Sequence, residues 1–177
     1  MSKTKFLISA GHSTVPPVDP GAVSGNMQES KLALRMRDMV AERLRAKNFT
    51  VIEDGADGVS EPLKKAIALC SQADVRIEFH FNAGPPAATG VEVLSLPKYK
   101  TLSQIIAVAV AAATGQKLRG DKGWKPDNAG QHHRLAFCQA GGVIVELAFI
   151  SNAADMKKYL ANEDKVADSL AQALATV

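Results

Sequence analysis

Four side chains of this sequence have the chemistry of a metallohydrolase site: His12, Glu29, His80 and Glu146. Two histidines and one carboxylate, with a fourth position left open, are a common ligand set for catalytic zinc. Zinc held in this way lowers the pKa of a water molecule to about 7 and polarises a carbonyl group. A second glutamate beside the ligands would carry the proton that hydrolysis has to move. These residue types predict a zinc hydrolase with three ligands, His12, Glu29 and His80, and Glu146 as the proton carrier.

The positions of these residues indicate how they could meet. The three ligand candidates are 17 and 51 positions apart, unlike the compact spacing of a zinc finger, so the fold would have to assemble the site. His12, His80 and Glu146 each follow an apolar run, and Glu29 falls in the first turns of an expected helix. Ligands of an open parallel sheet gather at the carboxyl ends of its strands. We therefore expect the four side chains to lie at one sheet edge.

Each residue also has an ordinary structural explanation. His12 could cap a turn, Glu29 could be solvated on its helix, and His80 could be a hydrogen-bonded core residue. Glu146 could be a salt-bridged residue, since a carboxylate after an apolar run is costly without a partner or a task. Glu78 should share the strand face of His80 and is a candidate partner for a ligand. His132 and His133 lie in a long polar stretch, where we expect solvent or substrate contacts. Only the convergence of the four residues favours the functional interpretation.

The elements that must position these residues alternate between strands and helices. The apolar patterns predict an α/β fold, a three-layer single domain with a mainly parallel twisted sheet flanked by helices. The expected strands span residues 5–10, 49–52, 75–81, 90–96 and 143–147, with a short segment at 135–138 completing the sheet. The expected helices span residues 27–47, 61–72, 102–114, 153–160 and 164–175, and the stretch 115–134 is read as a polar loop.

Composition limits the class of protein. The 177 residues suit one domain, 1–177, without a separate wall-binding domain. The net charge of +3 and the absence of a basic stripe argue against nucleic acid as a partner. Cys70 and Cys138 have no metal-ligand spacing and are expected as buried free thiols. Nothing resembles a secretion signal or a membrane span, and the last helix is expected to pack on the sheet, so we expect no stable membrane insertion.

The chain resembles the zinc-dependent N-acetylmuramoyl-L-alanine amidases, which cut the bond between the lactyl group of muramic acid and L-alanine in peptidoglycan. The matching segments cover nearly the whole chain: Ser9-Ala10-Gly11-His12, Asp19-Pro20-Gly21-Ala22, Glu29, Phe79-His80-Phe81-Asn82-Ala83, Arg119-Gly120 with Trp124-Lys125-Pro126-Asp127, and Val143 to Asn152. The resemblance implies His12, Glu29 and His80 as zinc ligands and Glu146 as the catalytic glutamate. Asn82 and Trp124 are candidate substrate contacts, although Trp124 could equally anchor its loop.

The resemblance has two departures and one implication for biology. Family members usually have serine where Glu78 stands and glycine where Ala148 stands, and neither change removes a ligand. A lone catalytic domain without a signal looks like a compact phage endolysin, which would stay in the host cytoplasm until the membrane is breached and then act on the cell wall. A bacterial wall-remodelling amidase is the alternative. We expect a monomer.

Two other classes of function remain open from the sequence. A zinc carboxypeptidase of the same architecture would need a cation for a terminal carboxylate, and Arg119 or Arg134 could supply it. A catalytically dead wall-binding domain would be expected to lose Glu146 or a ligand. All four residues are present, which argues against the dead domain.

Overall fold

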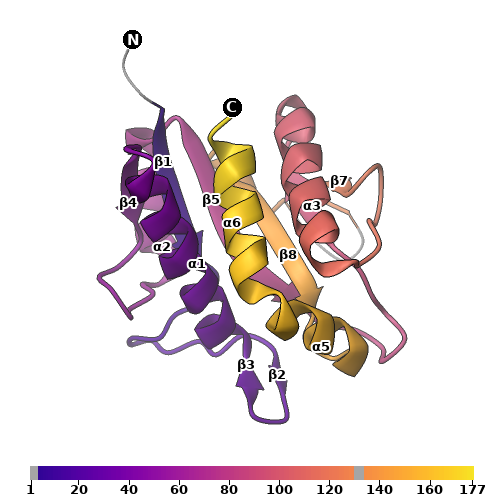
Figure 1. The fold of residues 1–177 in the computed structure, drawn as a ribbon. Helices are drawn as coiled ribbons and strands as arrows, with labels where there is room; N and C mark the ends of the chain where they lie inside the picture. Colours follow the sequence, from indigo (N-terminus) through magenta and orange to yellow (C-terminus); the bar gives the residue numbers. More distant parts are fainter. Residues whose placement is uncertain (1–3, 130–133) are drawn as a thin grey trace.

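The apolar runs of the sequence form one six-stranded sheet in the computed structural model, which describes residues 4–129 and 134–177 (Figure 1). Its strand order is β4-β1-β5-β8-β6-β7. β4, β1, β5 and β8 are parallel, whereas β6 runs antiparallel to β8 and parallel to β7. The six strands are β1 (Lys5–Ala10), β4 (Thr50–Glu53), β5 (Val75–Asn82), β6 (Glu92–Ser95), β7 (Trp124–Pro126) and β8 (Val143–Phe149). The mainly parallel α/β fold predicted from the sequence is confirmed.

The helices lie on both faces of this sheet, and a small hairpin precedes the first helix. The α-helices are α1 (Glu29–Ala46), α2 (Leu63–Leu69), α3 (Lys100–Thr114), α4 (Ala136–Gln139), α5 (Ala153–Ala161) and α6 (Glu163–Leu174). Two 3₁₀ turns, Cys70–Gln72 and Pro97–Tyr99, follow α2 and precede α3. The hairpin consists of β2 (Val23–Ser24) and β3 (Met27–Gln28).

One face of the sheet is covered by long helices. Side chains from alternate strand positions, such as Phe6, Ile77 and Val145, are fully buried there against α1, α3 and α6. The last helix packs in the same core, with Leu170 and Leu174 fully buried, as expected. In the described part of the chain, no helix has the length and apolar character needed to cross a membrane.

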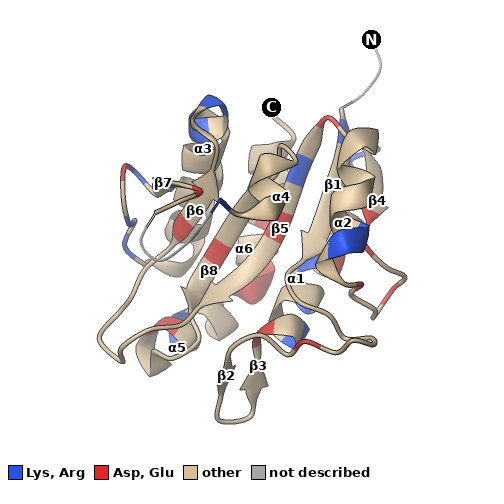
Figure 2. Ribbon diagram, turned by 180° about the vertical axis from the view of Figure 1, so that it is seen from behind, with Lys and Arg blue, Asp and Glu red and all other residues tan. Residues whose placement is uncertain are grey.

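The opposite face is covered by the short helices α2 and α4, and acidic positions occur on the strands beside them (Figure 2). Leu7, Leu94 and Ile144 pack there against α2 and α4. Since side chains alternate along a strand, Glu78, His80 and Glu146 belong to this second face. The acidic positions of β6 and β8 lie side by side in Figure 2, because Glu92 pairs with Glu146. The uneven cover leaves room for a site on this face.

Three details differ from the sequence expectation. Residues 135–138 do not complete the sheet, because Ala136–Gln139 is a helical turn packed on the second face. The stretch predicted to be a polar loop contains the edge strand β7. This strand pairs with β6 through backbone groups, and it lacks the apolar alternation that would have indicated a strand. Glu146 lies in the middle of β8 because Leu147, Ala148 and Phe149 are also buried and extend the strand.

Candidate metal centre

The loop after β1 places His12. Ser60 Oγ donates a hydrogen bond to the His12 carbonyl at 2.6 Å, and Gly11 N donates to the Phe79 carbonyl at 2.8 Å. His12 has a positive φ of 69°, a conformation that non-glycine residues seldom adopt. Such backbone strain persists where the surrounding structure holds it, often at functional sites.

Glu29 begins α1, and two backbone N–H groups hold its carboxylate. Ala22 N donates to Oε2 at 2.8 Å and Phe81 N donates to Oε1 at 3.0 Å. The Glu29 N–H in turn donates to the Ala22 carbonyl at 2.9 Å. Phe81 follows His80 on β5, so the same carboxylate connects the start of α1 to the end of a strand. The orientation of Glu29, only 4% exposed, is therefore fixed by the backbone around it.

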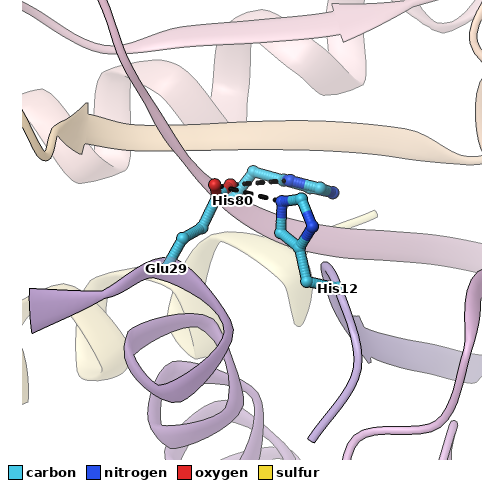
Figure 3. Close-up of side chains that lie close together, drawn as sticks. All are labelled: His12, Glu29 and His80. Carbon is cyan, nitrogen blue, oxygen red and sulfur yellow. Dashed lines mark hydrogen bonds and ion pairs between the residues drawn. The ribbon is translucent and has the colours of Figure 1, made fainter. Parts of the chain in front are cut away.

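The three candidate ligands meet at one point (Figure 3). Nε2 of His12 lies 3.0 Å from Glu29 Oε2, and Nδ1 of His80 lies 2.9 Å from Glu29 Oε1. One ligand atom from each of the three residues lies within 4.8 Å of the other two. The structure therefore brings together the three residues that the sequence singled out.

Two glycines make this approach possible. A Cβ added to Gly11 would lie 2.3 Å from the His80 ring, and one added to Gly21 would lie 2.5 Å from His12 Cδ2 and 2.6 Å from Glu29 Oε2. Gly21 also has a positive φ of 64°. A side chain at either position would displace a ligand candidate, so the Ala10-Gly11-His12 and Pro20-Gly21-Ala22 segments are shaped around the centre.

Each histidine has a carboxylate on its other ring nitrogen. Asp19 Oδ2 lies 2.8 Å from His12 Nδ1, and Glu78 Oε1 lies 3.1 Å from His80 Nε2. Glu78 is 3% exposed, and Ser9 Oγ donates to its other oxygen at 3.3 Å. Carboxylates in this position fix the tautomer of a histidine and leave the opposite nitrogen free for a metal. Glu78 thus occupies the supporting place considered from the sequence.

The electrostatics of the metal-free centre are dominated by burial and by this pairing. Burial disfavours the charged forms of His12 and His80, but the carboxylates around them, Glu29 with Asp19 or Glu78, together outweigh it, so both histidine pKa values lie above their usual range. Burial would also raise the pKa of Glu29, yet the two histidines hold it far below its ordinary value. The centre therefore favours cations beside an ionised Glu29, and a divalent ion would satisfy the same carboxylate.

Glu146 lies beside the centre. It pairs in register with His80 on one side and Glu92 on the other, and it is 9% exposed. Its Oε2 atom has no hydrogen-bond partner among the described residues. Burial raises the pKa of Glu146 to about 7, with Glu29 and Glu92 adding to the effect. A carboxyl group with a pKa near neutrality can both accept and return a proton.

The donor set fits zinc. Two imidazole nitrogens and a carboxylate oxygen are typical of a catalytic zinc site, and the supporting carboxylates match the usual surroundings of such ligands. The two cysteines lie elsewhere, buried and unpaired, as the sequence predicted. Burial raises the pKa of Cys138 to about 12, so its thiol is not a ready ligand. A divalent ion held by these ligands beside Glu146 would supply the groups that metal-assisted hydrolysis requires.

A hollow surrounds the centre. A cavity of about 340 Å³ is lined by His12, Glu29, His80 and Glu146, together with Asn82 and Ala83. A second cavity of about 310 Å³ lies on the α2–α4 side and has mostly apolar walls, with Pro62, Leu63 and Phe137 among them. Both cavities are lined by His12 and His80, so they adjoin at the centre.

The structure separates the two candidate substrate contacts. Asn82 lines the cavity beside His80, and its Nδ2 atom donates to Glu92 Oε1 at 2.8 Å. Trp124 lies on the edge strand β7, where Nε1 donates to Ser95 Oγ at 3.0 Å and Lys100 Nζ lies 4.9 Å from the ring centroid. These contacts are those of an anchor for the edge strand. His132 and His133 lie outside the described residues.

Several residues of the site were not predicted to act there. Asp19 belongs to the segment Asp19-Pro20-Gly21-Ala22, but sequence reasoning assigned it no contact with a ligand. Its position before Pro20-Gly21 could have indicated one. Glu92 alternates with apolar neighbours in Val91-Glu92-Val93-Leu94, which indicates a polar side chain facing the second face.

A family model and a solved structure both relate this chain to N-acetylmuramoyl-L-alanine amidases. A family model described as N-acetylmuramoyl-L-alanine amidase matches residues 7–176. A solved putative N-acetylmuramoyl-L-alanine amidase from Neisseria meningitidis is 45% identical, with a TM-score of 0.88 over 98% of this chain and 94% of that one. An N-acetylmuramoyl-L-alanine amidase from Clostridium difficile 630 shares the fold, with 21% identity and a TM-score of 0.83 over 99% of this chain and 97% of that one. The uncharacterized protein YqiI of Bacillus subtilis (strain 168) is 27% identical over 92% of this chain and 79% of its own length.

Proposed function

Since the chain belongs to the N-acetylmuramoyl-L-alanine amidase family, we propose that it is a zinc-dependent peptidoglycan hydrolase that cleaves the amide bond between N-acetylmuramic acid and L-alanine. The observation that carries the zinc proposal is the convergence of His12, Glu29 and His80 within 4.8 Å beside a buried glutamate. Family membership supports the amidase activity, and the donor set supports the metal.

In this proposal three side chains hold the metal. His12 binds through Nε2 and His80 through Nδ1, because these nitrogens face Glu29 while Asp19 and Glu78 engage the other two. Glu29 is held ready by the N–H groups of Ala22 and Phe81. When bound, zinc supplies Lewis-acid polarisation of the scissile carbonyl and lowers the pKa of the attacking water.

Glu146 moves the proton. Its unpartnered Oε2 atom accepts a proton from the attacking water and delivers it to the nitrogen of the leaving L-alanine. Burial keeps this carboxyl poised near neutrality, and its neighbour His80 fixes it next to the metal ligands. Asn82 is a substrate contact in this proposal, since it lines the cavity and its side chain is steadied by Glu92.

Mass spectrometry of digested peptidoglycan tests the reaction. We expect intact stem peptides with a free L-alanine amine, together with glycan that retains its lactyl groups. Free amino acids released from the stems would instead indicate the carboxypeptidase-type alternative. The Glu146→Gln variant is the matched control, because it retains the shape of the side chain but cannot accept the proton as a carboxylate does.

We further propose lysis of a bacterial host by a phage as the biological setting, with wall remodelling by a bacterial enzyme as the alternative. In the lytic setting, protein produced in the cytoplasm of a test bacterium leaves the cells intact until the membrane is permeabilised. Rapid loss of turbidity after permeabilisation, absent for Glu146→Gln, is the expected result. Wall damage before permeabilisation would contradict this timing.

A further inference from the structure

A third cavity continues from the candidate metal centre along β6. It has a volume of about 320 Å³, and its walls include Asn82, Glu92, Arg119, Lys125 and Phe149. Asn82 and Ala83 line both this cavity and the one around His80 and Glu146, so the two spaces adjoin. The amidase proposal assigns no role to the cations at this end.

The two cations share one buried carboxylate. Lys125 Nζ lies 2.7 Å from Glu92 Oε2, and Arg119 Nε donates to the same oxygen. Glu92 is 5% exposed at its side chain, whereas Arg119 and Lys125 are 29% and 26% exposed. The pair therefore presents one positive charge more than Glu92 neutralises.

Arg119 is held in place and retains unused donors. Arg119 Nη1 donates to the Thr89 carbonyl at 3.3 Å, and its Cζ lies 4.8 Å from the centroid of the Phe149 ring. Among the described residues, Arg119 donates only through Nε and Nη1, so Nη2 has no hydrogen-bond partner. A guanidinium fixed on an aromatic ring, beside an ammonium, is well suited to a carboxylate, because charge-assisted hydrogen bonds are strong and directional.

The distance to Glu146 limits which carboxylate could arrive. Glu92 and Glu146 are paired across neighbouring strands, which are about 4.8 Å apart. An extended peptide advances roughly 3.3–3.6 Å per residue. A substrate with its scissile amide at Glu146 therefore needs about one to three residues to bring a carboxylate to Arg119 and Lys125.

We propose that the cavity lined by Arg119, Lys125 and Glu92 is a subsite for a free carboxylate on the stem peptide, close to the scissile amide. This subsite rests on the proposed amidase function and adds a preference for stem peptides that carry a free carboxylate. Glu92 orients the two cations, and Arg119 Nη2 and Lys125 Nζ contact the carboxylate. The opposite, apolar cavity near Phe137 lacks such cations among its described lining residues.

The test uses two muramoyl peptides that differ only at the second stem residue, which carries either a free carboxylate or a carboxamide. We expect the wild type to favour the free acid by roughly 10-fold or more in kcat/KM, as expected for a hydrogen bond between charged groups. The Lys125→Met and Arg119→Gln variants should each bring this preference close to one. Lys100→Met is the matched control, because Lys100 pairs with Asp121 and lies over Trp124 outside the cavity, and it should keep the wild-type preference.

Equal kcat/KM values for the two peptides in the wild type, or an unchanged preference in both variants, would overturn the subsite. A binding measurement separates this failure from failure of the amidase proposal. Calorimetry with Glu146→Gln and the two stem peptides alone should show tighter binding of the free acid, whether or not the bond is ever cut. Equal binding of the two peptides would contradict the subsite, and cleavage of neither peptide by the wild type would contradict only the amidase reaction.

Discussion

Two buried charge clusters of this protein lie close together and are built differently. Arg37 is fully buried, and its three nitrogen atoms donate to Asp38, Asp54 and the carbonyls of Ala56 and Val59. The cluster of His12, Glu29 and His80 opens onto a cavity and has Glu146 beside it with an unpartnered oxygen. The donors of Arg37 are all engaged and hold loops, although Asp54 Oδ2 has no hydrogen-bond partner among the described residues, whereas the histidine cluster opens onto a cavity that can hold a ligand.

The two clusters are also connected. Asp54 Oδ1 accepts a hydrogen bond from Arg37 and a longer one, 3.4 Å, from Ala10 N at the end of β1. Ser60, next to Val59, binds the carbonyl of His12. The Arg37 cluster therefore supports the loop that carries one of the ligand candidates. Buried charge, even with an unpartnered oxygen, therefore does not identify a functional site by itself. The histidine cluster differs because metal-ligand atoms converge there beside a cavity.

The largest expected effect comes from Glu146→Gln. Without the carboxylate, general acid-base catalysis is lost, and kcat should fall roughly 10²–10⁴-fold. The thermal midpoint should stay the same or rise, because a buried carboxyl with a raised pKa is replaced by a neutral amide. Timed digestion of muramoyl peptides measures kcat, and calorimetric unfolding of the same samples measures the thermal midpoint. Turnover close to that of the wild type would remove Glu146 from its role.

Arg37→Met should show the opposite pattern to Glu146→Gln, with a large loss of stability and little change at the metal centre. Removing the guanidinium leaves Asp54 buried without its partner, which costs about 3–5 kcal/mol of unfolding free energy. Zinc affinity of the protein that remains folded should fall only slightly, because the cluster supports the His12 loop through Val59 and Ser60 but supplies no ligand. Urea denaturation and a chelator competition assay measure the two effects. A loss of zinc affinity without loss of stability would show that the two clusters are not divided as we describe.

Glu78→Gln should weaken zinc binding about 10–100-fold, because the carboxylate supports His80 from its far ring nitrogen. Asp19→Asn is the matched comparison on His12 and should have the smaller effect, since Asp19 is 60% exposed at its side chain and solvent can replace it. Competition with a chromophoric chelator gives both affinities. Equal zinc affinity in Glu78→Gln and the wild type would leave Glu78 with a packing role only.

The smallest expected effect is on the pH dependence of the metal-free fold. The pKa values of His12 and His80 are raised, so their contribution to stability is complete below about 6.5 and is lost as pH rises through the folded-state values. Glu146 acts in the same direction as pH passes about 7. Chelator-treated protein should therefore be more stable to urea at pH 6 than at pH 9, with a smaller difference in His80→Gln. An identical pH dependence in the two proteins would contradict this coupling.

Much of the fold was accessible from the sequence because its signals are local. The runs Phe6 to Ala10 and Val143 to Leu147 and the apolar faces of the long helices predict the strands and helices that the structure contains. Edge strand β7 was missed because its three residues pair with β6 through backbone groups and show no apolar alternation. Residues 135–138 were misassigned because a short apolar segment does not distinguish a helical turn from a strand.

For the site, the sequence indicated which residues could act, but it did not indicate their hydrogen-bond and ion-pair partners. His12, Glu29 and His80 could be selected because their chemistry is specific and their strand-end positions converge. Trp124 was predicted either to contact substrate or to anchor its loop. Its indole N–H donates to Ser95, which fits the anchor and leaves the substrate contact a prediction. The ion pairs of Arg37 with Asp54 and of Glu92 with its two cations join residues 17 to 33 positions apart, and no local pattern indicates them.

X-ray absorption at the zinc edge identifies the atoms that hold the metal. The protein loaded with zinc should bind one ion per chain, with two imidazole nitrogens at about 2.0–2.1 Å and a carboxylate oxygen in its first shell. His80→Ala should lose one imidazole contribution and most of the bound zinc. A spectrum without histidine ligands, or zinc content unchanged by His80→Ala, would contradict the account.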